Sequence, residues 1–437
     1  MTGAPPNPRA PAWLFAALAA LTLPLVVSDR SLAYDDHLEP AVLLAEGGAL
    51  PAPDACWECH QPPLYYALEA AAFTLSGAHS PSGRLAVARA LSWLLAASLW
   101  GVAWALARRV RSSPGERLAA TLFFVTLPAC FLLHATLSND VAAVALSGWL
   151  FAWLARAVDP ERPAPSAAGW GAAGLLAGLA VLAKTTALPG VVVLAAAAWS
   201  RGAGQASRGG RAGSACAALA GAALAVGPWL ARNLAVSGRL MPLRMQTQAY
   251  TPPDPGYFTS FRFLDLLAEP FAAAPGDTFL THLDRPGPVD GSWLTRLYSL
   301  FFHESLGYLP PLWPWLVAAL YAVGLIVVLL VVAGAIEALR RPRPDRLDRL
   351  ALLFAALAFA LLASFNAAYP SRLLVHGKAV FVMPAWPALF VLYARGVGAA
   401  SEWGGRRAAP AVLCAHLTIQ ALFVAHAFAV VASLVLS

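Results

Sequence analysis

Residues 34–66 read YDDHLEPAVLLAEGGALPAPDACWECHQPPLYY and directly follow the first apolar segment of the chain. The stretch contains an adjacent carboxylate pair, further acids, two histidines and a Cys-x-x-Cys. The chain around it is apolar, since hydrophobic residues make up 59% of its 437 residues and charged residues only 12%. Soluble domains carry about 25% charged residues. We therefore expect a polytopic membrane protein in which this stretch is a polar loop at one surface.

The apolar residues fall into about eleven segments (between about ten and twelve), against the roughly 20 residues that cross a bilayer as a helix. The segments are 13–27, 85–106, 118–133, 141–154, 170–182, 188–199, 215–230, 313–336, 350–365, 379–392 and 411–436. The fifth and sixth are short for two full crossings and could instead form a hairpin of short helices turning near Lys184. No small-residue cleavage site follows the first segment, which reads as a retained helix. We expect residues 1–437 to form one all-α membrane-embedded domain.

The positions of Lys and Arg predict the orientation. Most of the 30 basic residues lie in every second loop, and the positive-inside rule places such loops in the cytoplasm. The N-terminus is then cytoplasmic, and two long loops, 28–84 and 232–311, face the periplasm of a bacterial inner membrane. Aromatic runs in the second loop, such as YFTSFRFLDLL, are typical of interfacial amphipathic helices. Because topology accounts for the pI of about 9.4, we expect no nucleic-acid partner.

The first long loop holds two groups of candidate reactive side chains. Asp35 and Asp36 lie close to the membrane surface, where a carboxylate beside an acceptor hydroxyl can act as a general base; an ordinary solvated loop is the alternative. The run from Cys56 through Cys59 to His60 matches the C-x-x-C-H haem-attachment pattern. In an oxidising compartment a disulfide, or a pair of thiols, is the simpler interpretation. A bound metal and haem are the further alternatives.

Other polar residues occur where apolar segments end on the same predicted outer side. Asn139 and Asp140 follow Ser138 after the third segment, and N-capping of the fourth helix explains them equally well. Lys184 and Lys378 are the chain's only lysines. Charges near a membrane core are costly, which makes them functional candidates. The remaining outer candidates are Arg232, Arg372 and His376.

Taken in order, these motifs resemble the GT-C superfamily of polyprenyl-phosphate-sugar-dependent glycosyltransferases, which includes protein O-mannosyltransferases and lipid A aminoarabinose transferases. The matching motifs are Asp35-Asp36, His60-x-Pro62-Pro63-Leu64-Tyr65-Tyr66, Asn139-Asp140, Gly178-Leu179-Ala180-x-Leu182-x-Lys184, Pro228-Trp229-x-x-Arg232-Asn233 and His376-Gly377-Lys378. The first motif reads Asp-Asp-His where Asp-Glu is commoner, which leaves the identity of the base open. The Cys-x-x-Cys is not a general feature of the superfamily.

The resemblance implies an inverting glycosyltransferase that moves a hexose or pentose from a polyprenyl-phosphate donor to a periplasmic lipid, glycan or protein acceptor. It implies Asp35 or Asp36 as the catalytic base. The cations implied to bind the donor phosphate are Lys184, Arg232, Arg372 and Lys378. The supporting residues are His37, His60, Tyr65, Asn139, Asp140 and His376. A divalent metal held by Asp36 and Asp140 is an open alternative, and haem is not expected.

Other functions remain as alternatives. A transporter or flippase of lipid-linked sugars would spread ionisable residues through its helices, whereas here they gather at one surface, and the sequence shows no transporter-type internal repeat. A membrane c-type cytochrome would use the CWECH motif. An accessory subunit would keep the fold without catalysis.

Overall fold

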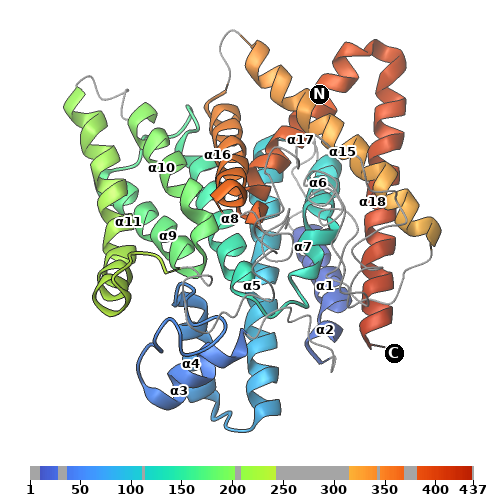
Figure 1. Cartoon of the computed structure of the whole chain (residues 1–437). Coiled ribbons are helices and arrows are strands. Elements are labelled where there is room, and N and C mark those ends of the chain that lie inside the picture. The colour runs from blue at the N-terminus through green and yellow to red at the C-terminus, as the bar shows by residue number, and fades with distance from the viewer. Residues whose placement is uncertain are drawn as a thin grey trace.

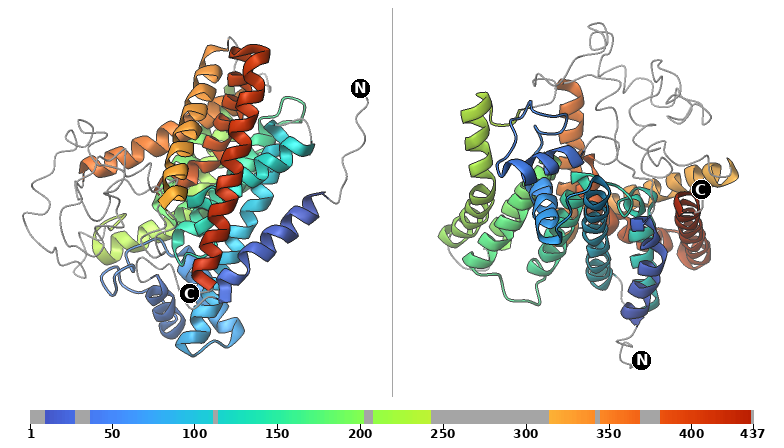
Figure 2. Two further views of the ribbon diagram at one scale, coloured as in Figure 1. Left: turned by 90° about the vertical axis from the view of Figure 1, so that its right-hand side faces the viewer. Right: turned by 90° about the horizontal axis from the view of Figure 1, so that it is seen from below.

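The computed structural model describes residues 10–27, 37–110, 114–201, 208–242, 314–341, 345–368 and 381–435. Within these ranges the chain is helical and contains no β-strand. Long helices lie side by side in a bundle, and a small lobe projects beyond one end of it (Figures 1 and 2). This arrangement confirms the all-α membrane architecture that the composition predicts.

Each predicted apolar segment coincides with a helix or a pair of helices. The earlier bundle helices are α1 (Ala10–Thr22), α2 (Pro24–Val27), α5 (Pro81–Val110), α6 (Pro114–Thr126), α7 (Pro128–Leu132), α8 (Asn139–Ala157) and α9 (Ala167–Ala183). The later ones are η1 (Thr185–Ala187), α10 (Leu188–Arg201), α11 (Arg208–Ser237), α15 (Pro314–Arg340), α16 (Arg346–Ala368), η6 (Met383–Ala385), α17 (Trp386–Trp403) and α18 (Gly405–Val435). The lobe contains α3 (Leu38–Gly47) and α4 (Leu64–Ser76).

Six of the described helices are long and apolar enough to cross a membrane. They are parts of α5, α8, α11, α15, α16 and α18. The helices of the first segment and α9 are apolar but shorter. Proline explains the interruption of two segments, because it has no amide hydrogen to donate and favours the first turn of a new helix, as at Pro24 and Pro128. The chain is a multi-pass membrane protein, and a count of eleven spans stays a prediction.

The region around Lys184 forms the hairpin that the sequence left as an alternative. Helix α9 ends at Ala183, and Lys184 takes an extended conformation with φ −157° and ψ 137°. The short turn η1 then reverses the chain into α10, which packs back against α9. The extended conformation of Lys184 ends α9, and the Lys184 side chain is buried in the protein.

Helix α8 is the core of the bundle. It packs against α5, α9, α10, α17 and η6. Of its apolar 18-residue stretch, 72% is buried within the protein. Close contacts of small residues draw other helices together. On α15, a Cβ added at Gly334 would overlap the carbonyl oxygen of Leu392, and one added at Gly396 on α17 would overlap that of Leu330. Glycine is therefore required where α15 and α17 cross.

Charged residues join three helices at the end of the bundle away from the lobe. The Asp345 carboxylate contacts Arg109 of α5 at 3.4 Å and Arg395 of α17 at 3.2 Å. Arg395 also donates to the buried Asp348 of α16 at 2.8 Å. These residues flank loops that the positive-inside rule assigns to one side, so their proximity agrees with the expected topology, whose orientation stays a prediction.

Candidate functional site

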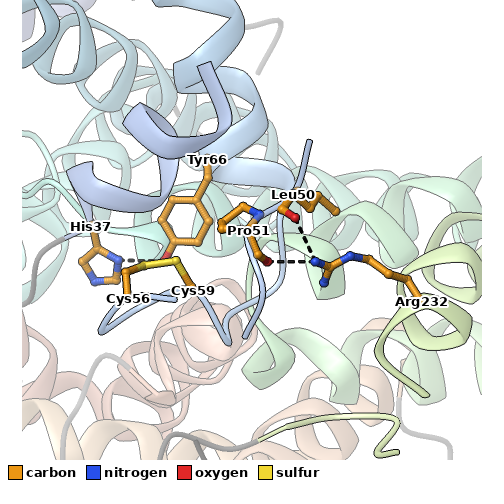
Figure 3. The surroundings of a disulfide bond; sticks show 7 residues. All are labelled: His37, Leu50, Pro51, Cys56, Cys59, Tyr66 and Arg232. Atoms are coloured by element: carbon orange, nitrogen blue, oxygen red, sulfur yellow. Dashed lines mark hydrogen bonds between the residues drawn. A yellow bond between two sulfur atoms is a disulfide. The ribbon is translucent and has the colours of Figure 1, made fainter. Parts of the chain in front are cut away.

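The lobe is the structural form of the first predicted loop from His37 onward. Helices α3 and α4 end at Gly48 and Gly77, whose φ angles of 64° and 66° suit glycine. Cys56 and Cys59 are joined by a disulfide in the connection between the two helices. As Figure 3 shows, Nδ1 of His37 also lies 2.9 Å from the Tyr66 hydroxyl, with both side chains buried. The disulfide and this hydrogen bond fix the chain on either side of α3.

Arg232, at the lobe end of α11, attaches the lobe to the bundle. Its Nη2 donates hydrogen bonds to the carbonyl oxygens of Leu50 and Pro51 at 2.9 and 2.8 Å (Figure 3). In the structure the guanidinium holds the backbone between α3 and α4. The phosphate-binding role that the sequence suggests for this cation stays a prediction. The adjoining pocket, lined among others by Gln61 and Trp229, has a volume of about 20 Å³. That is room for about one water molecule, not for a sugar ring.

Asp140 and Lys184 form a buried ion pair beside the lobe. Lys184 Nζ lies 2.7 Å from Asp140 Oδ2, and the two residues are only 7% and 6% exposed. The same carboxylate oxygen accepts a hydrogen bond from Ser138 Oγ at 2.7 Å. The lysine ammonium also lies 5.3 Å from the centre of the Phe381 ring. The structure therefore pairs Lys184, which the sequence assigned to the donor phosphate, with an aspartate that the sequence predicted as a supporting residue or a metal ligand.

Ser138 is the N-cap of α8, and its side chain accepts from the Asp140 amide at 3.2 Å. The N-cap explanation thus applies to Ser138 and leaves the next two side chains for other contacts. Asn139 Oδ1 and Asp140 Oδ1 are both buried and have no hydrogen-bond partner among the residues that the structure describes. Asn139 makes a long contact of 3.5 Å from Nδ2 to Gln61 in the lobe. Unpaired buried acceptors are costly, so these oxygens suit a ligand that donates hydrogen bonds.

A further buried carboxyl, Glu69 of α4, was missed by the sequence reasoning. Burial raises its pKa from the ordinary 4.5 to about 8, and hydrogen bonding from Tyr65 offsets part of this increase. The pKa of Tyr65 is itself raised, mainly by burial and then by the Glu69 charge. The Tyr65 hydroxyl lies 2.7 Å from Ser92 Oγ of α5. The sequence signal was a single Glu within the apolar run LYYALEAAAFTL.

The structure brings Tyr65, Asn139, Asp140 and Lys184 together at the junction of the lobe with α8 and α9, and His37 lies nearby through Tyr66. His60 is partly buried in the turn after the disulfide. Several predicted site residues lie outside the described residues: Asp35, Asp36, Arg372, His376 and Lys378. The predicted interfacial helices of 232–311 also lie outside them beyond residue 242.

The described part of the chain does not assemble a metal site by itself. It contains no group of three or more His, Cys, Asp or Glu residues placed to hold an ion. Asp140 has one carboxylate oxygen occupied by Lys184 and Ser138, which leaves only Oδ1 for a metal. Asp36, the other suggested ligand, lies outside the described residues. A metal held by Asp36 and Asp140 stays a prediction.

No protein-family model matches the sequence. A search of curated proteins also found no match. Among solved structures, the chain is similar to ArnT from Cupriavidus metallidurans bound to undecaprenyl phosphate, with 16% identity, a TM-score of 0.53, and coverage of 98% of this chain and 77% of that one.

It is also similar to the oligosaccharyltransferase of Archaeoglobus fulgidus tethered to an acceptor peptide, with 13% identity, a TM-score of 0.53 and coverage of 97% of this chain. The chain spans only 55% of that enzyme's length. At these identities the likeness establishes the fold, which is the GT-C fold.

Proposed function

We propose that the chain is an inverting glycosyltransferase that takes a sugar from a polyprenyl-phosphate donor at the periplasmic side of a bacterial inner membrane. The observation that carries the proposal is that the shared fold covers nearly the whole chain, 98% in the comparison with ArnT, which was solved with undecaprenyl phosphate. The structure of the second neighbour contains an acceptor peptide. The proposed reaction requires an acceptor and a sugar linked to a lipid phosphate, and it releases the lipid phosphate as a product.

The buried polar cluster supports the same proposal independently of the fold. A membrane protein that buries an ion pair beside unpaired carboxylate and amide oxygens keeps an unfavourable arrangement, which is common where ligands bind. Asn139 Oδ1 and Asp140 Oδ1 can accept hydrogen bonds from sugar or acceptor hydroxyls. His37 contacts Tyr66, the residue that follows Tyr65 of the cluster, and Asp35-Asp36 immediately precede His37 in the sequence.

In the proposed reaction, Asp35 or Asp36 removes the proton of the acceptor hydroxyl. The acceptor oxygen forms a bond to the anomeric carbon as the bond from that carbon to the phosphate oxygen breaks, with inversion. The electrons of the broken bond leave with the polyprenyl phosphate, whose charge is stabilised by Lys184, Arg372 and Lys378. Arg232, whose Nη2 also holds the lobe, is the fourth cation that we assign to this phosphate. The transferred group is a hexosyl or pentosyl residue, and the acceptor is a lipid, a glycan or a protein.

The test is transfer by the purified protein in lipid nanodiscs from a panel of radiolabelled undecaprenyl-phosphate sugars to membrane and protein acceptors. Loss of a general base lowers rates by roughly 100-fold to 10,000-fold, so Asp35→Asn or Asp36→Asn should show a loss of this size. Asp54→Asn is the matched control, because Asp54 is an exposed aspartate of the same loop. Full activity in both of the first two variants would refute the base assignment. No transfer by the unmodified protein from any donor would refute the function.

A further inference from the structure

Glu69 is a buried carboxyl that the proposed reaction does not use. It lies on α4 with 1% of its surface exposed, and its Oε2 has no hydrogen-bond partner within the described residues. Tyr65 and Phe73, one turn before and after it on the helix, are also buried, so Glu69 lies on the face of α4 that is turned into the protein. An ionised carboxylate in such surroundings is strongly disfavoured. The proton therefore stays on Glu69 near neutral pH, in agreement with its raised pKa of about 8.

A chain of polar contacts leads from Glu69 to the buried ion pair. The Tyr65 hydroxyl lies 2.7 Å from Ser92 Oγ. Hydrogen bonding with Glu69 raises the pKa of this hydroxyl and hydrogen bonding with the Ser138 backbone lowers it, so both groups lie next to Tyr65. Ser138 then donates from Oγ to Asp140 Oδ2 at 2.7 Å, and the same oxygen holds Lys184. One tyrosine hydroxyl thus links the lobe helix α4, helix α5 and the first turn of α8.

We propose that Glu69 is a positioning residue of this site: in its neutral form it holds the Tyr65 hydroxyl against Ser138, and so fixes the geometry of the Asp140–Lys184 pair. As far as it concerns catalysis, the inference rests on the proposed function. Glu69 itself touches no substrate in this scheme and acts only through Tyr65. The role belongs to the neutral carboxyl, because a neutral group adds no charge beside Asp140.

The surroundings explain why ionisation of Glu69 would disturb the site. The charges of Glu58, Glu69 and Asp140 all raise the pKa of Tyr66, after burial itself, which shows that three carboxyls converge on this part of the lobe. A negative charge on Glu69 would add to this repulsion. The charged groups on and between the elements packed around α4 are Glu39 and Glu46 on α3, Glu58 before α4, Arg84, Arg89, Arg108 and Arg109 on α5, Asp140 and Arg156 on α8, and Lys184 at the end of α9. Of these, Arg84 forms an ion pair with Glu46.

The catalytic test is the pH dependence of transfer in three variants. Glu69→Gln keeps the shape and hydrogen-bonding oxygen of the neutral carboxyl but has no proton to lose. We expect the wild-type rate to fall as the pH rises through about 8, and the Gln variant to stay active at pH 7 and to lack this fall. Glu69→Leu should lower the rate roughly tenfold or more at every pH, as is typical when a group that orients a site residue is removed. The control is Glu46→Gln, which neutralises an exposed carboxylate of the same lobe and should behave like the wild type.

An alkaline fall that is unchanged in Glu69→Gln would overturn the proposal, and so would wild-type activity in Glu69→Leu. A large loss at pH 7 in Glu69→Gln would also overturn it, because the ionised carboxylate would then be the required form. Each of these results requires that sugar transfer is measured. It would therefore refute the role of Glu69 without refuting the proposed function.

A second measurement needs no substrate. The folded-state pKa of Glu69, about 8, lies above the ordinary value of 4.5. The proton thus stabilises the folded state fully below pH 4.5, and this contribution is lost as the pH rises to about 8. The thermal unfolding midpoint of the wild type and of Glu46→Gln should therefore fall across this range, and the fall should be smaller in Glu69→Gln. Parallel curves for all three proteins would overturn the proposal. If the unfolding midpoints differ as expected but the protein transfers no sugar, the proposed function is refuted and the proposal about Glu69 is not.

Discussion

The Asp140–Lys184 pair allows a quantitative test of the site, because both partners are buried and the contact is short. At 2.7 Å and an effective dielectric constant of about 20, the attraction between two unit charges is about 6 kcal/mol. Removing the two groups from water costs several kcal/mol for each ion and offsets much of this attraction. The net contribution of the pair to the free energy of unfolding is therefore small. Removing only one of the two charges is strongly destabilising, because the other charge stays buried without its partner.

Lys184→Met should destabilise the protein by about 3–5 kcal/mol, because it leaves the Asp140 carboxylate buried without its cation. Asp140→Asn should cost less, since the Phe381 ring stays beside the ammonium and cation–π contacts contribute about 1 kcal/mol. The double variant removes both charges. It should be more stable than Lys184→Met alone, with a coupling energy of at least about 2 kcal/mol.

The assay is chemical unfolding of the purified protein in mixed detergent micelles, followed by tryptophan fluorescence, for the wild type, both single variants and the double variant. The matched control is the pair of Arg84 and Glu46, which are 2.8 Å apart but have side chains 13% and 59% exposed. Its cycle, with Arg84→Met and Glu46→Gln, should give below about 1 kcal/mol. A coupling energy under about 0.5 kcal/mol for the buried pair would refute the view that the two charges are held together in a dry site.

Three further variants test the parts that surround the site. Replacing Cys56 and Cys59 by Ser should destabilise the lobe by about 2 kcal/mol, because the disulfide closes a short loop; an unchanged rate of proteolysis of the lobe would contradict this. Gly334→Ala should destabilise the bundle by about 1–3 kcal/mol by overpacking. Its control is Gly227→Ala, because a Cβ added at Gly227 meets nothing within 4 Å, and this variant should be neutral or slightly stabilising. Thermal unfolding measures both. Arg232→Met should free the lobe and increase its hydrogen exchange by removing two charge-assisted bonds worth roughly 1.5–3 kcal/mol each; unchanged protection of Leu50 and its neighbours would argue against the clamp.

The pattern of apolar segments was enough to predict the helices of the bundle, because a helix in lipid must satisfy its own backbone hydrogen bonds and be apolar along its length. It also placed a break near Lys184, since two short segments leave no room for two full spans. Segment length alone does not reveal where proline divides a segment into two helices, as at Pro128.

Within the site, the sequence predicted candidate residues but not the contacts between them. Asp140 and Lys184 stood out as charges beside apolar segments, but their pairing depends on how α8 meets α9. The contact of Arg232 with the lobe was not predicted, because its acceptors, the backbone carbonyls of Leu50 and Pro51, have no side-chain signature. Glu69 was not predicted, because a single Glu within an apolar helical run belongs to no motif.

The central position of α8 has a consequence for how this protein is made. Its polar first turn and most of its surface are covered in the finished structure by helices that include α17, which is synthesised near the end of the chain. When α8 first leaves the insertion machinery, lipid or a chaperone must occupy those faces. Chains truncated before Trp386 should therefore insert but fail to mature, and membrane quality-control proteases would be expected to recognise α8 as the exposed element.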